Sequence, residues 1–306
     1  MENGSYAFIC AVELSRIQLV EIENAIGIPF GIICRDEQYD PKELFTTVRK
    51  FDEEINDVAA MWGVRLIQFK DGNIEHIRDL FEGDYVNKML IGPVSMKLWH
   101  DSSDIKRKDK KSGYIVCIRE NQSQWKVITR EKDEKKIMSS DEIMEKLSIE
   151  EIPEAKGQFT VRVIMKVNIL GCYGNTKKRY RYILKKAERS LKEAVKLGHG
   201  PCAFEKCVKM LEEHPKEEWM EDVNEALTEL IRYKNMTLKL LYEAERYQVA
   251  RIAPEMPAEI QRFIQNADKL RKKLDQESTE YFRNHMKKLE DSERIITENW
   301  KLWIEY

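Results

Sequence analysis

The chain has 306 residues, of which 42% are hydrophobic and 35% charged, with 52 basic against 54 acidic side chains. This length and composition are typical of one large or two ordinary globular domains, and the near balance of charge argues against nucleic acid or an anionic membrane as the partner. No run of 18 apolar residues occurs and the N-terminus lacks a signal-peptide pattern, so we expect a cytoplasmic protein with no membrane partner.

The first half of the chain predicts a mixed α/β domain. The expected elements, in order, are a strand or helix start over 6–14, a helix over 20–25, a strand over 30–34, a helix over 42–61, a strand over 64–69, a helix over 73–82, strands over 91–96, 114–118 and 125–128, a helix over 141–147 and a strand over 159–169. Apolar residues alternate with polar ones from Phe159 to Val167, which is the period of a half-buried strand. Ser139 or Ser140 is the expected N-cap of the helix over 141–147.

The second half of the chain predicts helices alone. After Gly174, glycine and proline become sparse and the apolar residues recur with helical period. The expected helices run from 175 or 176 to 198, from 202 to 211, through the apolar positions 219–241, and from 258 to 303. Short connections between them favour an antiparallel bundle. A coiled coil is the alternative for the last helix, although its heptad pattern is not sustained over 275–281. We therefore expect two domains, 1–170 and 171–306.

The cysteines and the known short motifs indicate no bound group. Cysteines at positions 10, 34, 117, 172, 202 and 207 form neither a Cys-x-x-Cys motif nor a Cys/His ladder. This spacing predicts no zinc site and no disulfide framework, and we expect reduced, mostly buried thiols. The chain contains no P-loop, GxGxxG, HExxH or GxSxG motif. We therefore expect no cofactor and no metal.

Six short motifs follow one another along the chain. They are Gly-Ile-Pro-Phe-Gly at 27–31, Met-Trp-Gly-Val at 61–64, Gly-Pro-Val-Ser-Met at 92–96, Tyr-Ile-Val at 114–116, Ser-Ser-Asp-Glu-Ile at 139–143 and Phe-Thr-Val-Arg at 159–162. Their order and spacing resemble the butirosin-biosynthesis acyltransferase family, whose papain-like proteins occur beside non-ribosomal peptide pathways. The resemblance implies an α+β fold: a papain-like cysteine peptidase/acyltransferase domain of the double-glycine-peptidase type over 1–170, followed by an all-α helical bundle over 171–306.

The resemblance also implies a catalytic triad, and this chain departs from it. In the family a cysteine at the start of an N-terminal helix attacks a thioester or amide, a histidine takes its proton and an aspartate orients the histidine. Cys10 lies in the nucleophile's part of the chain, but the histidine position falls near Gly113 and the aspartate position on Thr129. His100, between Trp99 and Asp101, is the base we would name for an active enzyme.

Three functions are compatible with this pattern. The first is a protein with a degenerate triad that binds an acyl or peptidyl carrier protein or an acyl thioester, in a groove for which Phe30, Trp62, Trp99 and Trp125 are candidates unless they are ordinary core residues. The second is an active cysteine acyltransferase or amide-forming enzyme that uses Cys10 with a rearranged base. The third is a helical scaffold that forms a homodimer through Trp300, Trp303 and Tyr306.

Overall fold

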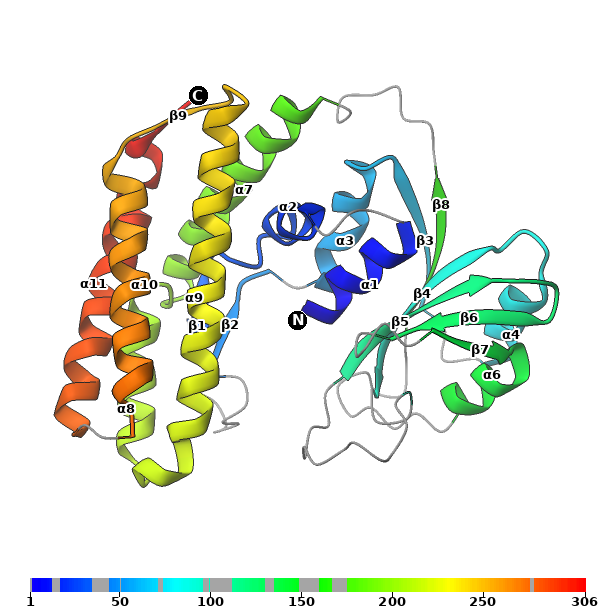
Figure 1. Ribbon diagram of the computed structural model, residues 1–306, viewed down its shortest axis with the longest axis horizontal. Coiled ribbons are helices and arrows are strands. Elements are labelled where there is room, and N and C mark those ends of the chain that lie inside the picture. Colours follow the sequence, from blue (N-terminus) through cyan, green and yellow to red (C-terminus); the bar gives the residue numbers. More distant parts are fainter. Residues whose placement is uncertain are drawn as a thin grey trace. The chain divides into compact units, whose positions relative to one another are not determined.

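The computed structural model describes residues 2–12, 17–34, 44–49, 51–70, 74–95, 99, 112–129, 135–148, 160–166, 175–275 and 278–306. The chain forms two compact units, which we call the sheet unit (1–19 and 56–170) and the helical unit (20–55 and 171–306) (Figure 1). The second segment of the helical unit begins at residue 171, the domain boundary expected from the sequence. Residues 20–55, expected in the first domain, instead belong to the helical unit.

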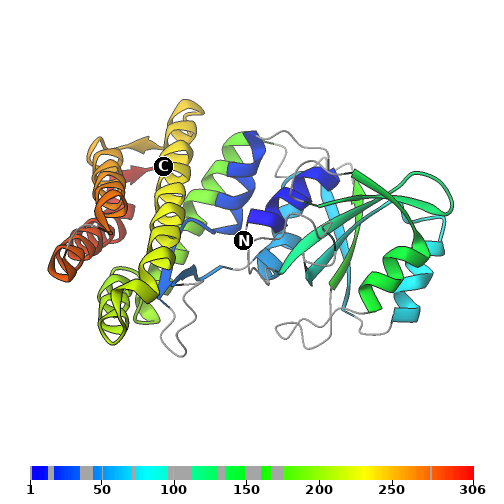
Figure 2. The same ribbon diagram turned by 60° about the horizontal axis from the view of Figure 1, so that its bottom comes forward.

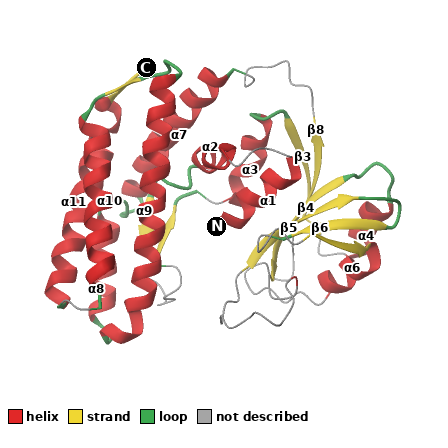
Figure 3. Cartoon of the chain, viewed as in Figure 1, coloured by secondary structure: helices red, strands yellow, loops and turns green. Residues whose placement is uncertain are grey.

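The sheet unit is built on six antiparallel strands in the order β3-β8-β4-β5-β6-β7. Figure 3 shows β3, β8, β4, β5 and β6 of this sheet in yellow. The strands are β3 (Val64–Lys70), β4 (Lys88–Ser95), β5 (Ser112–Arg119), β6 (Gln124–Ile128), β7 (Lys135–Ser139) and β8 (Thr160–Lys166). The chain thus has the mixed α+β class that was expected, with an antiparallel sheet and a helical C-terminal region. Its papain-like identity stays an expectation.

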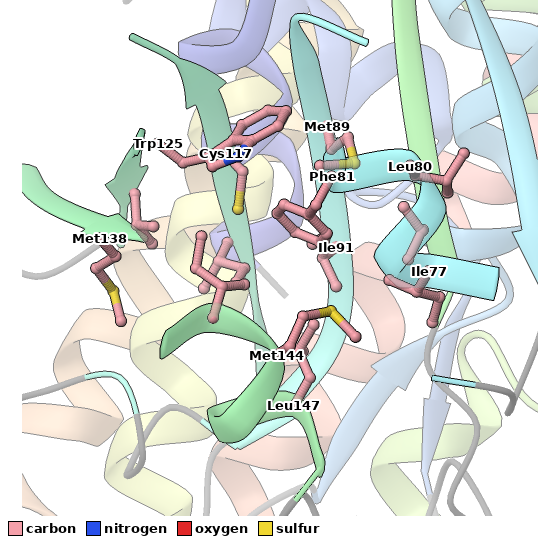
Figure 4. Packing of buried hydrophobic residues seen from close by; sticks show 14 of the residues in the cluster. Ile77, Leu80, Phe81, Met89, Ile91, Cys117, Trp125, Met138, Met144 and Leu147 are labelled. Carbon is pink, nitrogen blue, oxygen red and sulfur yellow. The ribbon is translucent and has the colours of Figure 1, made fainter. Parts of the chain in front are cut away.

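One face of this sheet packs on helices α4 (Ile74–Glu82) and α6 (Ser140–Ser148) through a continuous set of buried side chains, which we call the apolar cluster (Figure 4). It includes Ile77, Leu80, Phe81, Met89, Ile91, Val94, Trp99, Ile115, Cys117, Trp125, Val127, Met138, Ile143, Met144, Leu147, Val161 and Val163. Trp125 packs edge-on against Phe81, with ring centroids 5.0 Å apart. Because strand side chains alternate between faces, β5 and β6 each supply every second residue to this cluster.

The opposite face of the sheet is covered by α1 (Glu2–Val12), which contacts β4, β5 and β8. Figures 1 and 2 show α1 on one side of the sheet and α4 and α6 on the other. The buried residues of the strands that point away from the apolar cluster include Leu90, Val116 and Arg162. The sheet is therefore buried on both faces where these strands lie.

The helical unit contains a group of long helices. They are α7 (Thr176–Lys196), α8 (Cys202–Glu212), α9 (Lys216–Arg246), α10 (Glu255–Lys273) and α11 (Thr279–Trp303). Helix α2 (Ile17–Ile26) and two antiparallel strand pairs accompany them. The pairs are β1 (Ile32–Cys34) with β2 (Phe45–Thr47) and β9 (Arg251–Ile252) with β10 (Ile304–Glu305). Helices α9, α10 and α11 pack against one another in sequence order. Asn175 caps α7 and Ser278 caps α11, each through a side-chain oxygen that accepts a backbone N–H.

Two expected helices differ from the structure, and one strand of the sheet was not expected. The helix expected over 42–61 is a strand, β2, followed by the shorter helix α3 (Phe51–Ala60), because the β-branched Thr46 and Thr47 pair with β1. The helix expected over 258–303 is the two helices α10 and α11, since Ser278 starts a new helix. Strand β7 was not expected, and it lies at the sheet edge with Ile137 54% exposed.

Residues 20–55 are held in the helical unit by aromatic and ionic contacts. Phe30 packs edge-on against Trp300, with centroids 5.4 Å apart, and Phe45 packs against Phe204 at 5.3 Å. Glu54 accepts from Lys186 at 2.5 Å. Arg49 likewise pairs with Glu54 and with Glu193 of α7. A Cβ atom at Gly31, where φ is +73°, would lie 2.5 Å from the Ser190 carbonyl oxygen, so only glycine fits this approach to α7.

Candidate functional site

Cys10 lies near the C-terminal end of α1, two residues before the helix ends at Val12, and its side chain is partly exposed. The carbonyl end of a helix carries partial negative charge, which disfavours a thiolate. The resemblance implies the reverse arrangement, in which the positive N-terminal end of a helix lowers the pKa of the cysteine. At this position on its helix, the helix dipole does not stabilise the Cys10 thiolate.

The positions that correspond to the family's histidine and aspartate lie on the far face of the sheet from α1. Gly113 has the same parity on β5 as Ile115 and Cys117, and Thr129 follows Trp125 and Val127 at the end of β6. Side chains of this parity point toward α4 and α6. The structure thus brings Gly113 and Thr129 to one face of the sheet and Cys10 to the other.

The Gly92-Pro93 segment of β4 has a steric role in this region. Val94 is the register partner of Gly113, and a Cβ atom at Gly92 would lie 2.4 Å from the Tyr114 ring and 2.8 Å from the Gly113 carbonyl oxygen. Only glycine permits β4 and β5 to approach so closely here. This motif, which helped to suggest the family, therefore accounts for strand packing without any catalytic group.

The other candidate residues are placed as follows. His100 lies outside the described residues. His76 lies on α4, across the sheet from α1. His199 ends α7, where its backbone N–H donates to the Ala194 carbonyl at 2.9 Å, in keeping with the structural role expected for it. Burial raises the pKa of the Cys117 thiol, so Cys117 is an unreactive core residue, as predicted.

A pocket of about 410 Å³ opens beside Thr129 on the α6 side of the sheet. Its described lining is Trp99, Val127, Thr129, Lys136, Ile137, Met138, Glu142 and Lys146. The Lys146 ammonium lies 5.6 Å from the Trp99 ring centre, a cation–π distance. The pocket therefore combines apolar and aromatic walls with two cationic side chains and the Glu142 carboxylate, and its volume is within the range of small-molecule sites.

A capping box fixes the start of α6 at the pocket. Ser139 donates its backbone N–H to a Glu142 carboxylate oxygen at 2.7 Å, and the Glu142 backbone N–H donates to the Ser139 hydroxyl at 3.2 Å. The hydrogen bonds from Ser139 lower the pKa of Glu142 below its usual value. Trp125 donates its indole N–H to Ser140 at 3.1 Å, which joins the apolar cluster to the same turn. The Ser-x-x-Glu spacing in the sequence is the signal for this turn.

Two of the four aromatic residues proposed for a groove are core residues of their own units. Phe30 packs on Trp300 in the helical unit, and Trp125 is fully buried in the apolar cluster of the sheet unit. Trp99 is the one of the four that lines the pocket described above. For Phe30 and Trp125, the ordinary core role weighed against the groove is the correct one.

The surface proposed for dimerisation also needs correction. Trp300 is only 1% exposed, because it points into the helical unit toward Phe30. Tyr306 is 49% exposed and Trp303 is intermediate. Trp300 therefore stabilises the interior of this unit and cannot serve as a contact residue for a second subunit.

The described residues contain no helix that is both long and apolar enough to cross a membrane, and no group of three or more His, Cys, Asp or Glu side chains placed to hold a metal ion. Neither a scan against models of protein families nor a search of curated proteins found a match to this chain. The family resemblance thus depends on the residue pattern alone.

Proposed function

We propose that this protein is a papain-like relative of acyl-transferring cysteine enzymes that has a degenerate triad and acts by binding, as a partner protein in a specialised-metabolite pathway of the non-ribosomal peptide type. The observation that carries the lack of a working triad is the separation of Cys10 from the positions of Gly113 and Thr129 by the thickness of the sheet. A nucleophile, its base and the orienting acid must lie within hydrogen-bond reach of one another. The papain-like ancestry and the pathway are proposed from the residue pattern alone.

The pocket beside Thr129 is the site that we assign to binding. Val127, Met138 and Trp99 supply apolar contact for an acyl chain, and Lys136 and Lys146 supply cationic groups at the same pocket. A phosphopantetheine arm that carries an acyl thioester combines an apolar chain with a phosphate, and phosphate is a strong acceptor for lysine. The proposed partner is therefore an acyl or peptidyl carrier protein, or a free acyl thioester.

Calorimetric titration with S-butanoyl-phosphopantetheine tests this assignment. We expect binding that weakens at least about fivefold in Lys146→Ala or Lys136→Ala, because each variant removes a charge-assisted contact. Lys126→Ala is the matched control, since Lys126 lies on β6, pairs with Glu120 at 3.9 Å and is not part of the pocket lining. Equal affinity in all three variants, or no binding by the unmodified protein, would contradict the assignment.

Intact-mass spectrometry after incubation with the same thioester separates binding from chemistry. The proposal predicts a protein of unchanged mass and a thioester that is hydrolysed no faster than in buffer. A butanoyl adduct on Cys10 would instead favour the active cysteine acyltransferase. In that case His100→Ala should reduce turnover by roughly two to four orders of magnitude.

A further inference from the structure

Two buried cysteines meet inside the helical unit. Cys34 is the last residue of β1 and Cys207 lies in α8, and both side chains are fully buried. Strand β1 contacts α8, and the two thiols share a hydrogen bond. The two sulfur atoms are therefore neighbours in the folded chain, although 172 residues lie between them in the sequence.

The surrounding contacts hold these two elements together without help from sulfur. Gly200, just before α8, donates its backbone N–H to the Ile32 carbonyl at 2.8 Å. Phe45 of β2 packs on Phe204 of α8. A disulfide needs its two Cα atoms within about 7 Å and its Cβ atoms directed toward each other, so a strand and a helix that are already fixed in contact favour the bond.

The position of the pair in the chain gives such a bond a consequence. The helical unit is assembled from two separate pieces of sequence, 20–55 and 171–306, with the sheet unit inserted between them. Cys34 belongs to the first piece and Cys207 to the second. We propose that Cys34 and Cys207 are an oxidisable thiol pair whose disulfide covalently joins the two pieces of the helical unit.

Hydrogen peroxide is the oxidant class that suits a buried pair, because it is small and uncharged. One sulfur attacks a peroxide oxygen and becomes a sulfenic acid as water leaves; the second sulfur then attacks the sulfenic sulfur and a second water leaves. Two thiols thus lose two electrons and two protons in total, and one peroxide gives two waters. The hydrogen bond with Cys34 and burial raise the pKa of the Cys207 thiol, so thiolate is scarce and the oxidation is slow.

Peptide mapping of the full-length protein tests the proposal. The folded protein is treated with hydrogen peroxide, denatured, blocked with iodoacetamide and digested with trypsin. Cleavage after Arg16, Arg35, Lys206 and Lys209 places Cys34 in peptide 17–35 and Cys207 in peptide 207–209, apart from Cys202. We expect these two peptides to be joined, with a mass two hydrogens below their sum. The Tm should rise by several degrees, because the bond closes a long loop in the unfolded chain, and dithiothreitol should reverse the rise.

Matched variants make the outcome specific. Cys202→Ser removes the exposed cysteine of the same helix and should leave both the crosslink and the rise in Tm unchanged. Cys207→Ser should abolish both, and Cys207→Ala repeats this test with an apolar residue in case serine disturbs the buried site. Recovery of Cys34 and Cys207 as alkylated thiols after oxidation would overturn the proposal. A crosslinked protein with an unchanged or lowered Tm would also overturn it.

Discussion

In the sheet unit, the space between the sheet and helices α4 and α6 is filled by apolar side chains, whereas the helical unit buries ionised side chains in pairs. Lys234 and Glu293 form an ion pair in which the two side chains are 3% and 0% exposed. The buried Glu23 carboxylate pairs with Arg232 at 3.0 Å. Burial raises the pKa of Glu23, and the charge of Arg232 offsets only part of this effect.

This contrast indicates which changes each unit tolerates. An apolar core accepts substitutions that conserve its volume, because no atom in it requires one particular partner. Each member of a buried ion pair needs an oppositely charged partner, and removal of that partner leaves a buried charge without compensation. Residues 20–55 supply Glu54 as the partner of Lys186 and Glu23 as one of the two carboxylates that pair with Arg232, the other being Glu229 of α9. The helical unit should therefore depend on this segment more than the apolar cluster depends on any one of its members.

Removal of residues 20–55 from the helical unit should have the largest effect. A fragment of residues 175–306 keeps its apolar helical stripes and should retain helical circular dichroism. It loses the contact of Phe30 with Trp300, and it loses the carboxylates of Glu54 and Glu23 that pair with Lys186 and Arg232. We expect a loss of unfolding free energy above about 5 kcal/mol, more than any single core substitution. A fusion of 20–55 to 175–306 through a glycine-serine linker should recover most of it. Guanidinium unfolding of the two proteins measures the difference, and equal stability would refute the dependence.

Substitution of Lys234 should have the next largest effect. Lys234→Ala leaves Glu293 buried without its partner, and we expect a loss of about 3 to 5 kcal/mol in the free energy of unfolding. The double variant Lys234→Met, Glu293→Leu removes both charges and conserves volume, so it should recover most of this loss. Urea unfolding followed at 222 nm gives both values. If the double variant is no more stable than Lys234→Ala, the unpaired Glu293 carboxylate is not the cause of the loss, and the prediction is wrong.

A truncation in the apolar cluster should cost less than the broken ion pair. Met144 of α6 is buried in this cluster, and Met144→Ala should lower the free energy of unfolding by about 2 to 3 kcal/mol through lost burial and the cavity left behind. Met165 of β8 is 48% exposed, so Met165→Ala is the matched control and should change stability by less than about 0.5 kcal/mol. Similar losses in both variants would contradict the assignment of the core to the α6 face.

These differences also explain how much of the fold could be predicted. Strands β3, β4, β5, β6 and β8 were predicted, because their β-branched and apolar residues form short runs or alternate with polar ones. Strand β7 begins with the charged pair Lys135 and Lys136, and among its residues of described burial, 136–139, only Met138 is buried, so the sequence gives no strand pattern here. Residues 20–55 belong to the helical unit because of contacts such as that of Phe30 with Trp300. These residues are far apart in the sequence, so no local sequence pattern predicts the contact.

The candidate site was predicted only in part, for a related reason. Thr129 and Trp99 were singled out through the family resemblance, and both line the pocket. The pocket itself was not predicted, because three of its lining residues, Lys136, Ile137 and Met138, lie on β7, and β7 was not predicted. The resemblance implies a nucleophile at the start of a helix, and Cys10 lies in that part of the chain. The structure places it near the end, because α1 begins at Glu2.

Loss of the capping box should have a smaller effect than these core changes. Ser139→Ala removes the N-terminal hydrogen bond of α6 and should lower stability by about 1 kcal/mol at neutral pH. The pKa of Glu142 is lowered in the folded protein, so its contribution is fully present above the unfolded pKa and is lost as pH falls through the folded one. The loss caused by Ser139→Ala should therefore shrink below about pH 4.5. Denaturation curves at neutral and acidic pH test this, and a loss that does not change with pH would contradict the capping role.

The smallest expected effect concerns Cys10 and decides whether the sheet unit contains an activated nucleophile. Cys10 lies at the carbonyl end of α1, so the helix dipole does not stabilise its thiolate. We expect iodoacetamide to alkylate it at neutral pH no faster than an ordinary thiol with a pKa of about 8.5. Trypsin isolates Cys10 in peptide 1–16, so the same peptide from the urea-denatured chain is the reference. A Cys10 rate far above the rate in the denatured chain would restore the acyltransferase, because only a thiolate stabilised in the fold reacts so fast.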